Sequence, residues 1–231
     1  MPVLIGEFAL QGSLNNNVSG GPSLVALPFS SVFGQITSTG YVFGANQGLT
    51  FTSPALSSTS FSIELSFKFD ATSGWRKIAD FANLVPDTGL YNLNGALQVY
   101  PQSAAATADF APGTAVDVML TRNFAGTVIG YVNGQQRFTF NDSISNDALI
   151  TAANDELIFF VDDHATGQDE ASSGTANYIR IYDDALSASA VNALFLAGAP
   201  SAIPEPSICA AVLGTAAFGF SWRRRRNGAR A

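Results

Sequence analysis

The sequence predicts an all-β sandwich that is followed by a short helix and a separate apolar tail. Strand-like segments are short, recur along most of the chain and are separated by turns rich in Gly, Asn and Ser. In the clearest of them, Phe61–Phe69, apolar residues alternate with Ser62, Glu64, Ser66 and Lys68. The chain also holds 18 Phe among 231 residues, and aromatic residues favour strands. Together these observations predict one large β domain over residues 3–198.

Turn signals define where the strands of this domain begin and end. Asn94-Gly95 and Asn133-Gly134 are dipeptides that favour two-residue hairpins, and apolar residues alternate on either side of each. The predicted strands cover residues 3–10, 41–43, 49–51, 61–69, 75–81, 89–93, 96–100, 115–122, 127–132, 135–140, 157–161 and 178–182.

A helix is expected after the last strand. Ser187 is a suitable N-cap and Gly198 a suitable terminator, and Val191, Leu194 and Phe195 fall on one side between them. We therefore predict a short helix that packs on the sandwich, and a linker of small residues over 199–203.

The tail has three parts in a fixed order. Pro204, Glu205 and Pro206 form a stiff acidic motif, Ile208–Trp222 is a run of 15 uncharged residues, and four arginines follow it: Arg223, Arg224, Arg225 and Arg226. The run is slightly shorter than the roughly 17–25 residues that span a bilayer, and flanking residues with snorkelling arginines make up the difference. Arginines stay on the cytoplasmic side, so the tail predicts a transmembrane-type helix with residues before Pro204 outside.

This order of parts resembles the PEP-CTERM sorting signal over residues 204–226, which exosortases process in some Gram-negative bacteria. The resemblance implies transient insertion in the inner membrane, processing near Pro204-Glu205-Pro206, and a final place at the cell surface or outside the cell. An ordinary tail anchor that contains the same tripeptide is the alternative.

A domain that is sorted to the cell surface needs an export signal, and Met1–Gly6 has no basic region or apolar stretch. We expect the native chain to start upstream of Met1.

Charge and cysteine content exclude several functions. Residues 1–203 carry 17 acidic and six basic side chains, a net charge of −11, and no basic stripe. This argues against binding to nucleic acid and is compatible with binding divalent cations. The only cysteine, Cys209, lies in the tail, so the body has neither a disulfide nor thiolate chemistry.

Three segments of the body resemble the LamG-like, concanavalin A-like jelly roll. They are Phe61–Phe67, Tyr131-Val-Asn-Gly-Gln135, and Tyr178-Ile-Arg-Ile-Tyr-Asp183 with Ala185-Leu-Ser187. The resemblance implies the jelly-roll fold. It does not imply one function, because this scaffold carries lectins, glucanases, adhesion modules and inert spacers.

The residues of the body do not form a recognisable catalytic set. Retaining glycosidases need two carboxyls about 5–5.5 Å apart, and the best strand offers only Glu64. His164 is the only histidine, and it has no G-x-S-x-G motif to serve and no cysteine in the body with which to hold zinc. We therefore predict a protein that is not an enzyme.

Four carboxylates gather in one loop: Asp162, Asp163, Asp169 and Glu170. Calcium takes 6–8 oxygen ligands, which carboxylates and loop carbonyls supply, so a calcium site is one hypothesis. A solvated acidic loop and pairing with Arg76, Lys77 or Arg180 are the alternatives.

Trp75 and Arg76 follow Gly74 and form a candidate platform for a sugar or a partner, with packing at a sandwich edge as the alternative. The combined hypothesis is an exosortase-sorted surface or matrix protein whose domain binds glycan or another surface polymer, with calcium as a possible cofactor. The alternatives are a spacer protein without a specific ligand and a hydrolase with unrecognised carboxylates.

Overall fold

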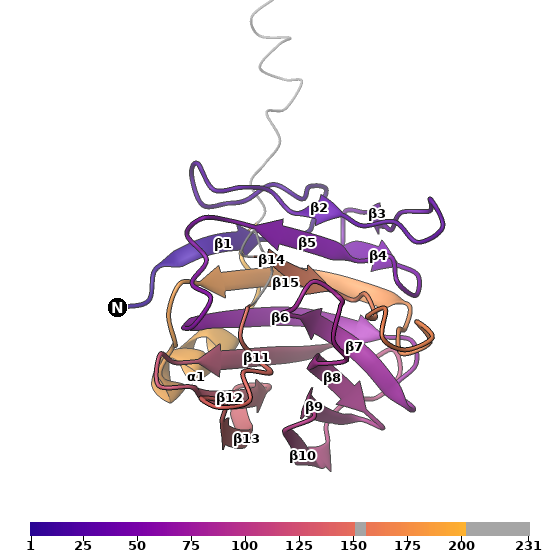
Figure 1. Cartoon of the computed structure of the whole chain (residues 1–231). Helices are drawn as coiled ribbons and strands as arrows, with labels where there is room; N and C mark the ends of the chain where they lie inside the picture. The colour runs from indigo at the N-terminus through magenta and orange to yellow at the C-terminus, as the bar shows by residue number, and fades with distance from the viewer. Residues whose placement is uncertain (151–155, 202–231) are drawn as a thin grey trace, which may run out of the picture.

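The protein is described by a computed structural model that covers residues 1–150 and 156–201 (Figure 1). These residues form fifteen strands and one helix. The elements are β1 (Leu4–Phe8), β2 (Val25–Ala26), β3 (Gln35–Ile36), β4 (Tyr41–Phe43), β5 (Leu49–Thr52), β6 (Phe61–Phe69), β7 (Trp75–Asp80), β8 (Gly89–Leu93), β9 (Ala96–Tyr100), β10 (Ser103–Ala108), β11 (Val116–Arg122), β12 (Thr127–Val132), β13 (Gln135–Asn141), β14 (Glu156–Phe159), β15 (Gly174–Tyr182) and α1 (Ala188–Ala197).

The strands form two antiparallel sheets that pack face to face as a jelly-roll sandwich. The first sheet has the order β13-β12-β11-β6-β15-β4-β3, and β1 pairs with the free half of β15. The second sheet has the order β10-β9-β8-β7-β14-β5-β2. Strands β2 and β3 therefore lie at one edge of the sandwich and β10 and β13 at the other (Figure 1). The predicted fold class is confirmed for the domain.

All twelve predicted strands are present, and the Asn-Gly turns are the hairpins that the sequence predicts. Both residues of Asn94-Gly95 and of Asn133-Gly134 have positive φ, as a two-residue turn of the favoured type requires. The structure adds β2, β3 and β10. Each of these is very short or, like β10, made of small residues without apolar alternation, so periodicity does not reveal them.

The core lies between the sheets and is rich in phenylalanine. The alternating apolar residues of β6 are all at most 1% exposed. Phe43 stacks on Phe160 with ring centroids 4.4 Å apart, and Phe67 and Phe69 contact the same ring. Interlocked aromatic rings of this kind supply the apolar burial that holds a domain without disulfides.

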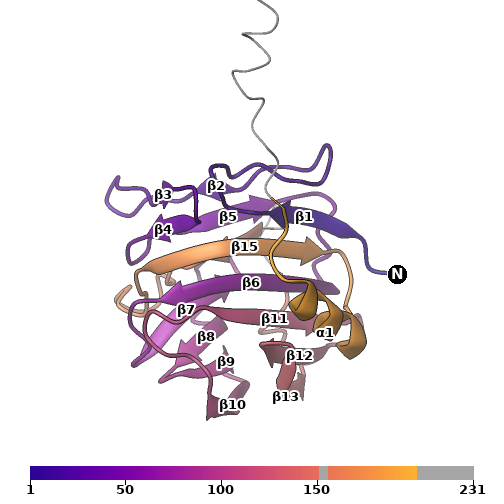
Figure 2. The same ribbon diagram turned by 180° about the vertical axis from the view of Figure 1, so that it is seen from behind.

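The predicted helix is confirmed and covers part of the outer face of the first sheet (Figure 2). The Ser187 hydroxyl accepts the amide of Ala190, and Gly198 closes the other end with φ +71°. Val191 packs with Met119 and Tyr131 of the sheet. In this way the helix buries apolar side chains on the face of the sheet that points away from the core.

The segment after α1 is held by one side chain of the sheet and one of the β1–β2 connection. Arg180 of β15 donates to the Gly198 carbonyl at 2.7 Å, and Asn17 donates to the Ser201 carbonyl at 3.0 Å. Within the described residues, no helix has both the length and the apolar character to cross a bilayer. The transmembrane-type helix predicted from the sequence lies outside the described residues.

Candidate functional site

A small pocket opens on the outer face of the second sheet. Its volume is about 110 Å³, and it is lined by Trp75, Asp87, Tyr100 and Glu170. Trp75 begins β7 and Tyr100 ends β9, whereas Asp87 lies in the β7–β8 connection and Glu170 in the connection from β14 to β15. Strands supply the aromatic floor of the pocket, and loops supply its two carboxyl groups.

The register of β7, β8 and β9 brings the aromatic side chains together. Lys77 lies opposite Tyr91, and Gly89 opposite Tyr100. The Trp75 ring meets the rings of Tyr91 and Tyr100 edge to face, with centroids 5.4 and 5.2 Å away. Such contacts fix the orientation of the indole before any ligand arrives.

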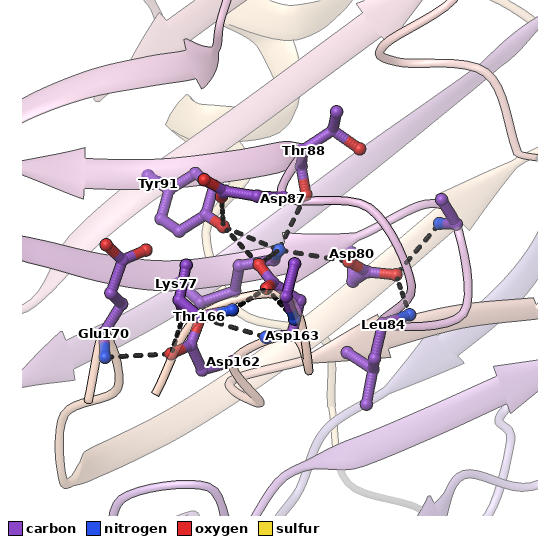
Figure 3. A network of polar contacts seen from close by, with 12 residues as sticks. Lys77, Asp80, Leu84, Asp87, Thr88, Tyr91, Asp162, Asp163, Thr166 and Glu170 are labelled. Carbon is purple, nitrogen blue, oxygen red and sulfur yellow. Dashed lines mark hydrogen bonds and ion pairs between the residues drawn. The ribbon is translucent and has the colours of Figure 1, made fainter. Parts of the chain in front are cut away.

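A buried ammonium group lies beside this aromatic cluster (Figure 3). The Lys77 Nζ is 3.0 Å from Asp163 Oδ2 and 3.1 Å from Asp80 Oδ2, and all three side chains are fully buried. It also donates to the Tyr91 hydroxyl at 2.7 Å and to the Thr88 carbonyl at 2.6 Å. Every direction in which the ammonium can donate is therefore used, as a buried charge requires.

Burial alone would raise the pKa of the Asp163 carboxyl, but the charge of Lys77 and the hydrogen bonds from Lys77 and Tyr91 outweigh it and lower that pKa. The pKa of Asp162 changes in the opposite direction: burial and the neighbouring charge of Asp163 raise it. The two adjacent carboxyl groups thus have different environments.

Asp162 organises the loop that carries Glu170. Its Oδ2 accepts the Glu170 amide at 2.9 Å, and its Oδ1 accepts the Asp163 amide at 2.9 Å. The loop is also tied to β7, since the Lys77 amide donates to the Glu170 carbonyl at 2.7 Å. The rim of the pocket is therefore attached to the sheet by hydrogen bonds to the backbone of Glu170.

Glu170 is the group of the pocket whose titration is most altered. Burial, followed by the charges of Asp162, Asp87 and Asp163, raises its pKa to about 7. Its carboxyl group therefore changes charge near neutral pH, next to the Trp75 ring.

The structure places the predicted platform residues in different roles. Trp75 lines the pocket, whereas the Arg76 guanidinium donates to the carbonyls of Trp75 and Asp169 and braces the loop. His164 is exposed, and its ring contacts Gln168. Asp87, Tyr91 and Tyr100 were not predicted, because their relation to Trp75 depends on strand pairing.

The four predicted acidic residues divide into two groups. Asp162 and Asp163 are buried and accept N–H groups or the Lys77 ammonium with both oxygens. Of the interpretations of the acidic loop, pairing with a basic residue is the one that the structure shows for Asp163, and its partner is Lys77. Asp169 is exposed, and Glu170 lies on the rim.

Oxygens that already accept protein donors do not fit calcium well. Within residues 1–150 and 156–201, no group of three or more acidic, His or Cys side chains is arranged to hold a metal ion. Calcium binding stays a prediction, and the exposed Asp169 and the rim residue Glu170 are the two of the four whose carboxylates it could still use.

Glu64, the residue considered for hydrolysis, lies on the outer face of the other sheet. It is fully buried and 2.9 Å from Arg180 Nη1. Burial and the nearby charge of Asp117 raise its pKa to about 7. Strand pairing brings Glu64 of β6 and Asp117 of β11 together, a relation that inspection of single strands missed. This carboxyl pair is covered by protein and does not open on the pocket.

Comparisons with known proteins agree with this architecture. Residues 43–192 match the concanavalin A-like lectin/glucanases superfamily, and residues 202–226 match the PEP-CTERM protein-sorting motif. The second match confirms the sorting resemblance and implies exosortase processing and a secreted or cell-surface protein. No curated protein sequence matches the chain.

Solved structures share the fold at low identity. Domain 4 of AbnA, a GH43 extracellular arabinanase from Geobacillus stearothermophilus in complex with arabinotriose, has a TM-score of 0.61 at 19% identity, covering 83% of this chain and 98% of that one. The binding domain of botulinum neurotoxin serotype D has a TM-score of 0.59 at 12% identity, covering 84% of this chain and 51% of that one. A Trypanosoma rangeli sialidase has a TM-score of 0.61 at 15% identity, covering 84% and 32%.

These structural relatives include both glycosidases and a binding domain, so at this identity they support the fold alone. The family match covers well over half of the chain, and it ends inside the helix that closes the sandwich. The chain therefore belongs to the concanavalin A-like lectin/glucanases superfamily.

Proposed function

We propose that this protein is an exosortase-sorted surface or matrix protein that binds a glycan at the pocket of Trp75, Asp87, Tyr100 and Glu170. The observation that carries the proposal is an indole that contacts two tyrosine rings edge to face and lines a pocket together with two carboxyl groups, those of Asp87 and Glu170. Aromatic faces pack against the apolar faces of sugar rings, and carboxylates accept hydrogen bonds from sugar hydroxyls.

The size and charge of the pocket restrict the glycan. Its volume of about 110 Å³ is below the roughly 300–1,000 Å³ of sites that enclose a small molecule. The pocket thus suits one sugar unit of a polymer, with weak affinity at each site. Because Asp87 and Glu170 line the pocket and the body is acidic, we expect a neutral glycan and not a uronic or sulfated one.

The proposal is tested by glycan-array binding of the full chain. Trp75→Ala is expected to lower affinity about tenfold, which corresponds to about 1.4 kcal/mol. Phe124→Ala is the matched control, because Phe124 is an aromatic residue that is 84% exposed and lies in the β11–β12 turn away from the pocket. If the wild-type chain bound no glycan, the spacer alternative would replace the proposal.

A hydrolytic function is tested with the same polymers. Release of sugar from a bound glycan, lost in Glu170→Gln but retained in Glu64→Gln, would place catalysis in the pocket. The test is needed because a glycosidase uses a pair of carboxyl groups, and Asp87 and Glu170 both line the pocket.

Calcium is proposed only for the outer part of the acidic loop, and it has its own test. Millimolar calcium should raise the melting temperature of the wild-type chain and not that of Asp169→Asn combined with Glu170→Gln. An unchanged melting temperature of the wild type would end the calcium hypothesis and leave the glycan proposal intact.

A further inference from the structure

One edge of the sandwich exposes many apolar side chains. Val25, Phe29, Val32, Phe33, Ile36 and Val42 are between 37% and 59% exposed, and we call this set the apolar edge. They lie on β2, β3 and β4 and on the connection between β2 and β3. They make up half of the twelve large hydrophobic side chains that are exposed in the described residues. Concentration on one edge, and not exposure of single residues, is what indicates an interaction surface.

The same part of the chain contains no charge. Residues 8–63 include no Asp, Glu, Lys, Arg or His, although the chain as a whole is strongly acidic. Edge strands usually carry charged residues, especially Lys, that keep other molecules away. Since β2 and β3 are only two residues long, strand pairing at this edge is already limited, and what the edge offers a partner is uncharged apolar side chains.

A tight turn projects the aromatic residues of the edge. Phe29 and Val32 exchange two backbone hydrogen bonds of 2.9 Å, with Ser30 and Ser31 between them. Both serines have positive φ, 49° and 66°, a backbone conformation that is uncommon for residues other than glycine. The fold thus maintains a costly turn that presents Phe29, Val32 and the adjoining Phe33 to the outside.

The described chain ends at this edge. After α1 it crosses Arg180 of β15, and its last residue, Ser201, is bonded to Asn17 in the β1–β2 connection (Figure 2). That connection lies beside the apolar edge, because its Gly12 amide donates to the Thr37 carbonyl directly after β3. The β1–β2 connection and β3 lie along the same side of the sandwich in both views (Figures 1 and 2).

The length of chain beyond Ser201 brings this edge close to the membrane. Six residues, 202–207, separate Ser201 from the uncharged run that begins at Ile208. At roughly 3.3–3.6 Å per residue, the seven steps from Ser201 to Ile208 span at most about 25 Å. While the run is inserted, the body therefore meets the bilayer surface with the edge from which the chain leaves.

We propose that the apolar edge docks on the lipid bilayer surface while the sorting tail is inserted, with Phe29 and Phe33 entering the interface between headgroups and acyl chains. An uncharged edge with aromatic side chains suits this interface, whereas the acidic remainder of the body is repelled by anionic lipid. Docking orients the body and limits the positions that the Pro204–Pro206 motif can take at the outer face. This inference is independent of the glycan proposal, since the pocket lies on the outer face of the second sheet.

The test is a comparison of two tryptophan probes in the full chain reconstituted into phosphatidylcholine vesicles with brominated acyl chains. Phe33→Trp probes the apolar edge, and Phe124→Trp probes an exposed turn at the opposite end of the first sheet. Both carry Trp222→Phe, so that the tail contributes no signal, and Trp75 contributes equally to both. We expect the bromine to quench the indole introduced by Phe33→Trp at least about twofold and the indole introduced by Phe124→Trp hardly at all, because bromine quenches only at contact depth in the interface.

Equal quenching of the two probes, or none of either, would overturn the proposal. Concentration-dependent dimers that are lost in Phe29→Ser combined with Phe33→Ser, without quenching of the Phe33→Trp probe, would show that a second copy covers the edge and would also overturn it. Hydrogen exchange supplies a second measurement on that double serine variant. Vesicles should protect residues 25–42 in the wild type only, and unchanged protection in a folded double variant contradicts lipid docking.

Discussion

The two outer faces of the sandwich use the same chemistry in different ways. Each buries a cation against a carboxylate and a tyrosine ring: Lys77 with Asp163 and Tyr91 on the second sheet, and Arg180 with Glu64 and Tyr178 on the first. On the first sheet the group is covered by the chain around Gly198. On the second sheet a loop forms a rim instead, and the pocket stays open.

This difference leaves one polar cluster closed and the other beside a pocket that opens to solvent. A helix and its following segment cover a polar cluster completely, because they lie flat on the sheet. A loop attached through Asp162 leaves the Trp75 ring accessible at its side. The closed cluster should therefore affect mainly folding, and the open one both folding and binding.

The largest effect is expected from Lys77→Met. This change leaves Asp80 and Asp163 buried without their cation, and breaking such a pair costs about 3–5 kcal/mol. Urea unfolding should show this loss of stability, whereas Lys68→Met, at a half-buried site on β6, should change stability by less than about 0.5 kcal/mol. Similar losses in the free energy of unfolding for the two variants would mean that the ion pairs of Lys77 do not stabilise the fold.

Glu64 provides a test of the closed face through pH. Its folded pKa, raised to about 7 by burial and by Asp117, lies above the value of about 4.5 in the unfolded chain. The folded state therefore holds more protons between these values, so this contribution is complete below pH 4.5 and is lost as pH rises through 7. We expect the loss to be about 1–3 kcal/mol between pH 5 and 8.

Glu64→Gln should remove the part of this slope that Glu64 contributes and leave the part that comes from Glu170, because the amide stays neutral and can still donate to Asp117 and accept from Arg180. Unfolding measured in urea at several pH values checks the prediction. A slope as steep in the variant as in the wild type would assign the titration to another group.

Local sequence signals were sufficient for most of the fold but not for the site. The alternation of β6 and the Asn-Gly turns depend on neighbours in the chain, so the hairpins could be predicted. The contact between Lys77 and Asp163 depends on β14 pairing with β7, across 86 residues of sequence. Periodicity within one strand does not reveal which distant strands pair. Trp75 was a candidate from its local sequence, whereas Tyr100 joins the site only because β7 pairs with β8 and β8 with β9.

On the open face, the same pH range should alter binding as well as stability. The pKa of Glu170, raised to about 7 by burial and by nearby carboxylates, means that the group gains charge as pH rises through neutrality. An ionised carboxylate accepts stronger hydrogen bonds from sugar hydroxyls, so affinity for a neutral glycan should increase about two- to fivefold from pH 6 to pH 8. Glu170→Gln should abolish that increase while Asp169→Asn retains it, as measured by titration calorimetry. An affinity that stays constant with pH in the wild type would remove Glu170 from the binding site.

The smallest effect concerns the end of the covering segment on the closed face. Asn17→Ala removes the 3.0 Å hydrogen bond to the Ser201 carbonyl, an exposed contact worth roughly 0.5–1 kcal/mol. Asn177→Ala is the matched control, because its amide also donates to an exposed backbone carbonyl, that of Thr39. Global stability should be almost the same in the two variants, but hydrogen exchange at residues 198–201 should increase only in Asn17→Ala. Because Arg180 still holds Gly198, the increase should be confined to the last residues of the segment. Faster exchange throughout α1 would instead show that the helix and the following segment open as one unit.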